Sequence, residues 1–161
     1  MNYNNGIDIQ NGWVAFNRGE GAEFTLGVAF QTNIGGSGGG NINWRTAPPI
    51  VTTDRSGANA VYGISYNAGR LETGIVNGTG QGTNNNTTLD TDVNHFATLE
   101  RDESGGSYEF TVDGAVIGSG TNAVNGVSLD DGDSVRLGNE GHGGSGQWTG
   151  YIGDVFFIDL E

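Results

Sequence analysis

The strongest constraint on the fold is an alternation of apolar and polar residues in short segments separated by glycine and asparagine. Residues 23–30 (EFTLGVAF) place Phe24, Leu26, Val28 and Phe30 on one face, and residues 107–114 (SYEFTVDG) place Tyr108, Phe110 and Val112 on one face. A period of two is typical of β-strands. Glycine and asparagine interrupt every candidate helix. The chain is therefore predicted to be all-β.

Turn signals divide these segments into hairpins. Residues 58–78 predict strand, turn and strand, with the turn at residues 67–69, and Asp113-Gly114 predicts a type I′ turn. DDGD at residues 130–133 predicts another turn before a strand starting at Ser134. Residues 33–43, 77–88 and 139–146 are interpreted as loops. We expect about eleven to thirteen short strands, a number typical of an antiparallel sandwich.

Length and composition limit the class of protein. The chain has 161 residues, and we predict a single domain over 1–161. It has no cysteine, which excludes disulfide and thiolate chemistry. No apolar run approaches 18 residues, so no membrane insertion is expected, and the first residues lack the pattern of a secretory signal.

The charge is strongly one-sided. The net charge is −13, and all six basic residues are arginine. An acidic surface argues against nucleic acid and anionic membranes as partners. A saline habitat and simple compositional drift both remain open as explanations of the lysine-free composition.

Catalytic residues are not predicted. Glu100 and Asp102 share a strand face, but the sequence then enters a turn, where aspartate is common. The chain has no cluster of several acidic residues along one strand, which glycoside hydrolysis by this class of fold would use. His95 begins a strand and is expected to pack or hydrogen-bond in the core. His142 lies in a glycine-rich stretch, and neither histidine has the sequence context of a nucleophile.

The candidate ligand-binding residues are Trp44, Arg45, His142 and Trp148. Sugars stack their apolar face on aromatic rings while planar polar groups bind their hydroxyls. Burial of the two tryptophans in the core remains the alternative. Trp13 is expected to be a core residue.

A candidate Ca²⁺ site consists of Asp130, Asp131 and Asp133, although their spacing does not match an EF-hand. A solvated turn is the alternative. No other cofactor is expected.

Residues 94–120 resemble the strand-turn-strand core of laminin G-like domains in the concanavalin A-like lectin/glucanase superfamily, with Arg101-Asp102 before the turn and Val112-Asp113-Gly114 after it. Residues 4–32, 50–75 and 135–161 are similar to the opening, middle and closing segments of that family. Asn94 departs from the family's tryptophan, and the last strand lacks its usual arginine. The resemblance implies a jelly-roll sandwich of two antiparallel sheets, and members of the superfamily often bind Ca²⁺.

These observations predict a non-enzymatic recognition module, an oligomer that binds a glycan or a surface protein. We expect it on a virion surface or in another extracellular setting, as a capsid decoration, turret or tail-fibre protein among other virion proteins. A structural cement protein without sugar binding is the alternative, and a diverged glycoside hydrolase is the third hypothesis.

Overall fold

The computed structural model describes residues 7–9, 13–17, 23–33, 47–53, 62–67, 69–75, 85–102, 106–121, 134–138 and 150–159. These residues form twelve strands and no helix, as the alternation predicted. Accordingly, they include no helix that spans a membrane.

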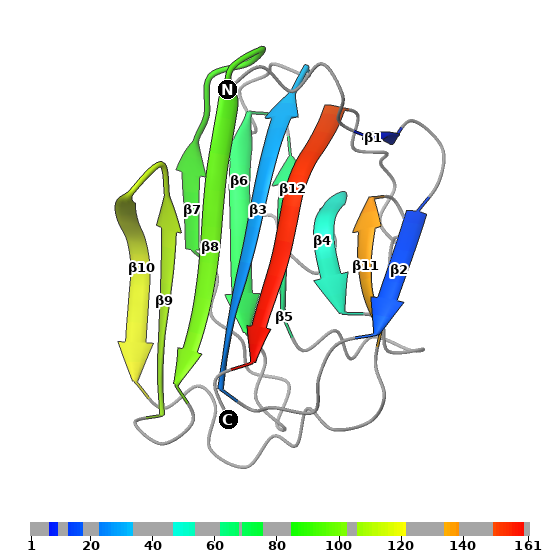
Figure 1. Ribbon diagram of the computed structural model, residues 1–161. Coiled ribbons are helices and arrows are strands. Elements are labelled where there is room, and N and C mark those ends of the chain that lie inside the picture. Colours follow the sequence, from blue (N-terminus) through cyan, green and yellow to red (C-terminus); the bar gives the residue numbers. More distant parts are fainter. Residues whose placement is uncertain are drawn as a thin grey trace.

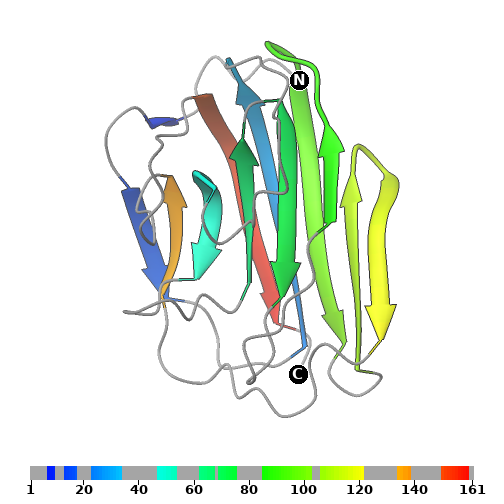
Figure 2. The same ribbon diagram turned by 180° about the vertical axis from the view of Figure 1, so that it is seen from behind.

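The strands form two six-stranded sheets that face each other (Figures 1 and 2). Sheet A contains, in spatial order, β1 (Ile7–Ile9), β12 (Gly150–Asp159), β3 (Phe24–Thr32), β8 (Asn94–Asp102), β9 (Ser107–Val112) and β10 (Ala115–Thr121). Sheet B contains β2 (Trp13–Asn17), β11 (Ser134–Gly138), β4 (Pro49–Thr53), β5 (Tyr62–Asn67), β6 (Arg70–Ile75) and β7 (Asn85–Thr88). Neighbouring strands pair antiparallel throughout.

The core lies between the two sheets and uses the predicted alternating positions. Phe24, Leu26, Val28 and Phe30 of β3 are completely buried. They pack in one cluster with inward side chains of both sheets, including Leu99, Phe110, Ile64 and Leu71. Because side chains of a strand alternate between faces, burying one set directs the intervening set outward.

The predicted hairpins are confirmed. Asp113 and Gly114 have φ values of 51° and 82°, the positive values that a type I′ turn requires. Gly69, in the turn between β5 and β6, has a φ of 91°. A strand begins at Ser134, as predicted, and the last strand covers Gly150–Asp159. The turn predicted at residues 130–133 lies outside the described residues.

One loop prediction is wrong at its end. Residues 85–88 (NNTT), interpreted as part of a loop, form β7, the edge strand of sheet B. Asn86 and Thr87 lie opposite Glu72 and Leu71 of β6. Asparagine has low β-propensity, but pairing with a formed neighbour outweighs propensity at an edge.

Candidate functional site

The predicted ligand-binding residues lie outside the described residues. This holds for Trp44, Arg45, His142 and Trp148, and for the proposed Ca²⁺ ligands Asp130, Asp131 and Asp133. Trp13 lies in β2. In the part of the chain that the structure describes, no group of three acidic or histidine side chains could hold a metal ion.

The outer face of sheet A instead brings polar and charged side chains together through strand register. Thr25 of β3 lies opposite Glu100 of β8, which lies opposite Glu109 of β9, which lies opposite Ser119 of β10. We call these four residues the carboxylate row. They face outward because their neighbours along each strand, such as Leu99 and Phe110, are buried in the core. Residues distant in sequence thus share one surface.

An aromatic pair lies on the same face. The rings of Phe96 (β8) and Phe156 (β12) are stacked, with centroids 5.9 Å apart and an interplanar angle of 30°. The Phe156 ring lies directly on Gly27 of β3, where a Cβ atom would be 2.2 Å from two ring carbons. Phe96 is 38% exposed. Glycine at this position lets the ring lie against the backbone and keeps an aromatic surface at the solvent boundary.

Hydroxyl groups separate the aromatic pair from the carboxylate row. Thr98 of β8 and Thr111 of β9 lie opposite each other, and their hydroxyls are hydrogen-bonded at 2.5 Å. Along β8, Phe96, Thr98 and Glu100 follow at every second residue. The distance from the aromatic residue to the carboxylate is therefore about 13 Å, at a rise of about 3.3 Å per residue. Along β8, the outer face of sheet A therefore presents first an aromatic surface, then hydroxyl groups and then carboxylates.

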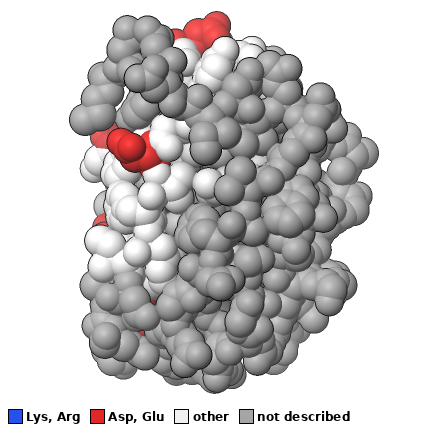
Figure 3. All heavy atoms as spheres, turned by 45° about the vertical axis from the view of Figure 1, so that its right-hand side comes forward, with Lys and Arg blue, Asp and Glu red and all other residues white. Residues whose placement is uncertain are grey.

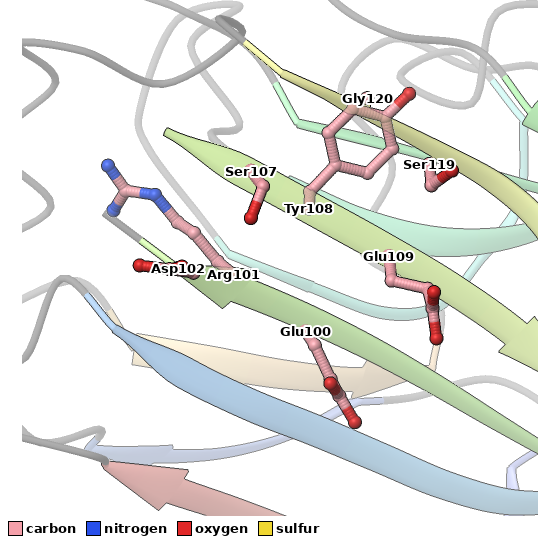
Figure 4. Close-up of a pocket in the computed structure, with 8 residues that line it drawn as sticks. All are labelled: Glu100, Arg101, Asp102, Ser107, Tyr108, Glu109, Ser119 and Gly120. Carbon is pink, nitrogen blue, oxygen red and sulfur yellow. The ribbon is translucent and has the colours of Figure 1, made fainter. Parts of the chain in front are cut away.

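A pocket of about 520 Å³ is lined by three residues of the carboxylate row, Glu100, Glu109 and Ser119. It lies over the end of β8, the start of β9 and the end of β10. Figure 4 shows Glu100 and Glu109 projecting to the same side of their strands, while the Tyr108 ring lies on the other side, over Gly120. The lining residues are Glu100, Arg101, Asp102, Ser107, Tyr108, Glu109, Ser119 and Gly120.

The outer face of sheet A is acidic. Glu100 and Asp102 are exposed and Glu109 is half-buried. Among the described side chains the basic ones are Arg101, which is 1% exposed, and Arg70, which hydrogen-bonds Asn86 on sheet B. Among the described atoms on the face that Figure 3 presents, acidic side chains are visible in red and none is blue. The described residues give this face no exposed cation.

Polar contacts of His95 and Asp113 fix the strand that carries the site. His95 is buried, as predicted: its Nδ1 lies 2.8 Å from a carboxylate oxygen of Asp113, and its Nε2 lies 2.9 Å from the Asp90 carbonyl. The other Asp113 oxygen accepts a hydrogen bond from the Phe96 amide at 2.9 Å. Asp113 therefore has a second role beyond the turn, because it ties the hairpin to the start of β8 next to Phe96.

A separate buried carboxylate lies on the outer face of sheet B. Glu72 is 2% exposed, and its Oε2 makes no hydrogen bond with the described residues. Burial raises the pKa of this carboxyl group above its usual value, and the nearby Arg70 guanidinium opposes that rise. Ser65 and Asn86 lie opposite it on the neighbouring strands.

Sequence reasoning placed Glu100 and Asp102 on one strand face but did not combine them with Glu109 into a site. The alternation of β8 also leaves Phe96 outward, since His95, Ala97, Leu99 and Arg101 are buried. Counting every second residue along this strand was therefore sufficient to identify Phe96 as an outward-facing aromatic residue. Its contact with Phe156, 60 residues away along the chain, depends on the order of strands in sheet A.

Comparison with known proteins identifies the fold. No protein-family model matches the sequence, and no curated protein matches it. The native heptameric SAP-like pentraxin from Limulus polyphemus is similar in structure, with a TM-score of 0.64 and 13% identity over 98% of this chain and 72% of the pentraxin.

Two further structures are binding domains. The CBM40 domain of the Ruminococcus gnavus IT-sialidase has a TM-score of 0.66 and 15% identity over 96% of this chain and 89% of that domain. The same domain has also been solved with alpha2,3 sialyllactose bound. The binding domain of botulinum neurotoxin serotype G has a TM-score of 0.60 and 11% identity over 92% of this chain, but over only 35% of that binding-domain chain.

At these identities the likeness shows the fold: an all-β jelly-roll sandwich of the concanavalin A-like type. The similar structures described above include binding domains, although the CBM40 domain comes from a sialidase.

Proposed function

We propose that the chain is a non-enzymatic glycan-binding module that binds its ligand on the outer face of sheet A. The observation that supports this most strongly is the stacked pair Phe96–Phe156 on the same face as a pocket of about 520 Å³ lined by Glu100, Glu109 and Ser119. Within the concanavalin A-like fold, we assign it to the laminin G-like group on the motifs of residues 94–120.

The chemistry of the face suits a sugar. The apolar side of a pyranose ring packs on an aromatic ring, and carboxylates and hydroxyls accept or donate hydrogen bonds to its hydroxyls. Binding sites for small ligands combine an apolar surface with a few convergent polar groups. Phe156 supplies the surface, held against Gly27, and the Thr98–Thr111 pair and the carboxylate row supply the polar groups.

The open position of the carboxylates supports binding rather than hydrolysis. Glycoside hydrolysis requires one carboxyl group kept protonated by an apolar environment and a second that is ionised, on opposite sides of the scissile bond. Glu100 is exposed, and it projects to the same side as Glu109. Because two directly opposed residues of adjacent strands are close enough for a retaining enzyme, an assay for released reducing sugar tests that alternative.

The setting is part of the proposal. An extracellular or virion-surface module gains affinity by repetition, so we propose a homo-oligomer that presents several copies of the face. A second candidate function, a structural cement protein between virion subunits, is favoured by exposed apolar side chains on sheet A: Val116 is 56% exposed, Ile158 48% and Tyr151 40%.

A glycan array with the intact protein tests the function, followed by calorimetry on the glycans that bind. We expect Phe96→Ala and Phe156→Ala each to weaken binding by about fivefold, because an aromatic contact of this kind contributes about 1 kcal/mol. Thr88→Ala is the control, since Thr88 is exposed at the edge of sheet B. An array without bound glycans, together with a stable oligomer, supports the structural role instead.

A further inference from the structure

The ring of His95 lies between two oxygen atoms that accept hydrogen bonds. Its Nδ1 is 2.8 Å from a carboxylate oxygen of Asp113, and its Nε2 is 2.9 Å from the main-chain carbonyl oxygen of Asp90. A neutral imidazole has one N–H group and one lone pair, whereas the imidazolium has two N–H groups. Because only the imidazolium donates to both oxygens, this arrangement belongs to the charged ring.

Asp113 connects this ring to the aromatic pair. Its second carboxylate oxygen accepts a hydrogen bond from the Phe96 amide at 2.9 Å, and its own amide donates to the Phe96 carbonyl at 2.8 Å. These two bonds tie residue 96 to the turn between β9 and β10. Since the Phe96 ring is stacked on Phe156, the position of the aromatic pair depends on where the Asp113 carboxylate is held.

We propose that His95 and Asp113 are positioning residues for Phe96, and that the protonation of His95 regulates binding on the outer face of sheet A. This inference rests on the proposed glycan-binding function and adds a pH-sensitive regulation of the same site. While the ring has two protons, the contacts run without a break from Asp90 through His95 and Asp113 to Phe96. Loss of one proton directs a lone pair at an oxygen atom and opens one contact.

The contact that opens is the one to the Asp90 carbonyl. Hydrogen bonds to an ionised group are stronger than those to a neutral group, so the remaining proton stays on Nδ1, facing Asp113. The ring then loses its positive charge, and the carboxylate loses a charged partner. Because hydrogen bonds in a connected network strengthen one another, the bond from the Phe96 amide to Asp113 weakens as well.

The described elements around the ring supply carboxylates and no basic side chain. On β3, Phe30 has its ring centroid 5.8 Å from that of His95, and its neighbours on that strand are uncharged. The segment before β8 contributes Asp90 and Asp92, whose side chains are exposed, and the turn after β9 contributes Asp113. Among these elements, the charge on His95 is therefore the one that holds the Asp113 carboxylate.

The variant Asp113→Asn separates charge from geometry. Asparagine suits this turn, since Asp113 has a φ of 51° and asparagine is favoured at positive φ. Its amide oxygen accepts from the Phe96 amide, and its NH₂ group donates to Nδ1 of a neutral His95 ring whose Nε2–H donates to Asp90. Neutral groups then make every contact, so we expect Phe96 to keep its position at all pH values.

Asp92→Asn is the matched control. Asp92 is also exposed and also has a positive φ, 59°, but it makes no contact with the His95 ring. The substitution therefore removes one carboxylate near the start of β8 and leaves the connection from His95 to Phe96 in place.

NMR spectroscopy of the intact protein from about pH 5 to about pH 8, the range in which histidines ordinarily change charge, tests the inference. The ring ¹⁵N signals of His95 report its protons, and hydrogen exchange reports the protection of the Phe96 amide relative to an unstructured peptide at the same pH. We expect this protection to fall about threefold as the second ring proton is lost, since one hydrogen bond is weakened. It should fall equally in Asp92→Asn and stay constant in Asp113→Asn.

Calorimetry at the same pH values tests the effect on binding. The probe is an uncharged glycan that binds in the array, so that the ligand itself does not titrate. We expect the wild type and Asp92→Asn to bind it about threefold more weakly once the ring has lost its second proton. Asp113→Asn should bind it equally well across the range.

Three results overturn the inference. They are a ring with a single proton at every pH while the Phe96 amide is fully protected, an affinity of the wild type that does not change as the ring loses its proton, and a pH dependence that persists in Asp113→Asn. The last would assign the effect to another group, such as Glu72 or His142. All three leave glycan binding itself intact, whereas an array without bound glycans at any pH contradicts the proposed function, and the Phe96 protection still tests whether His95 sets its position.

Discussion

Gly27 and Phe156 form a contact whose energy can be measured by a double-mutant cycle. An alanine Cβ at position 27 would lie 2.2 Å from two carbons of the Phe156 ring, a distance that no real contact tolerates. The ring must therefore leave the backbone and its stacked position beside Phe96. Inserting a methyl group into a packed site costs about 1–3 kcal/mol. Alanine regains about 0.5–1 kcal/mol over glycine in a strand.

We expect Gly27→Ala to lower the free energy of unfolding by about 1–2 kcal/mol, the balance of those two effects. In the Phe156→Ala background the clash is absent, and Gly27→Ala should then stabilise the protein by about 0.5 kcal/mol. The sign thus reverses between the two backgrounds.

Urea denaturation of the four proteins, followed by circular dichroism, gives the four free energies, and unchanged slopes confirm that stability alone has changed. The same effect of Gly27→Ala in both backgrounds would show that Phe156 does not lie on Gly27, and the account of the aromatic platform would then be wrong.

Three further predictions concern other parts of the molecule. Burial raises the pKa of Glu72 above its usual 4.5, so the folded state holds the proton more firmly than the unfolded state does. The stability contributed by this group therefore falls as the pH rises from 4.5 through the folded pKa. In chemical denaturation, the free energy of unfolding of Glu72→Gln should match that of the wild type at about pH 4 and exceed it at about pH 7. Asp113→Ala should cost about 1–2 kcal/mol in thermal unfolding, since it removes the acceptor for the Phe96 amide and for His95, and Asp113→Asn should cost less. Gly114→Ala should cost about 1 kcal/mol although an alanine Cβ there would meet no atom within 4 Å, because a φ of 82° is strained for alanine; an unchanged melting temperature would contradict that reasoning.

The parts of the fold that depend on local sequence were predictable. Alternation along residues 23–30 and 107–112 identified the inward side chains, and Asp113-Gly114 identified the turn. Each of these signals is contained within a few consecutive residues. The strand formed by the NNTT segment, residues 85–88, was not predictable from local sequence, because its conformation comes from pairing with β6 rather than from its own propensity.

The site was not predictable in the same way. Glu100 and Glu109 are recognisable as outward residues, but their direct opposition depends on the register of the β8–β9 hairpin, and a slip of one residue would reverse every face. Phe96 and Phe156 meet only because β3 lies between β8 and β12. Arginine is normally exposed, but Arg101 is buried and lies opposite Phe24 and Tyr108 on the neighbouring strands. Trp44, Arg45, His142 and Trp148 remain predictions.

The central claim is that the outer face of sheet A receives the glycan. An NMR titration of ¹⁵N-labelled protein with a glycan that binds in the array tests it most directly, because each amide reports its own surroundings. The account predicts chemical-shift changes that centre on residues 96–102, 107–111 and 118–120 and on Phe156. Saturable changes confined to sheet B or to other segments, with these amides unmoved, would contradict it.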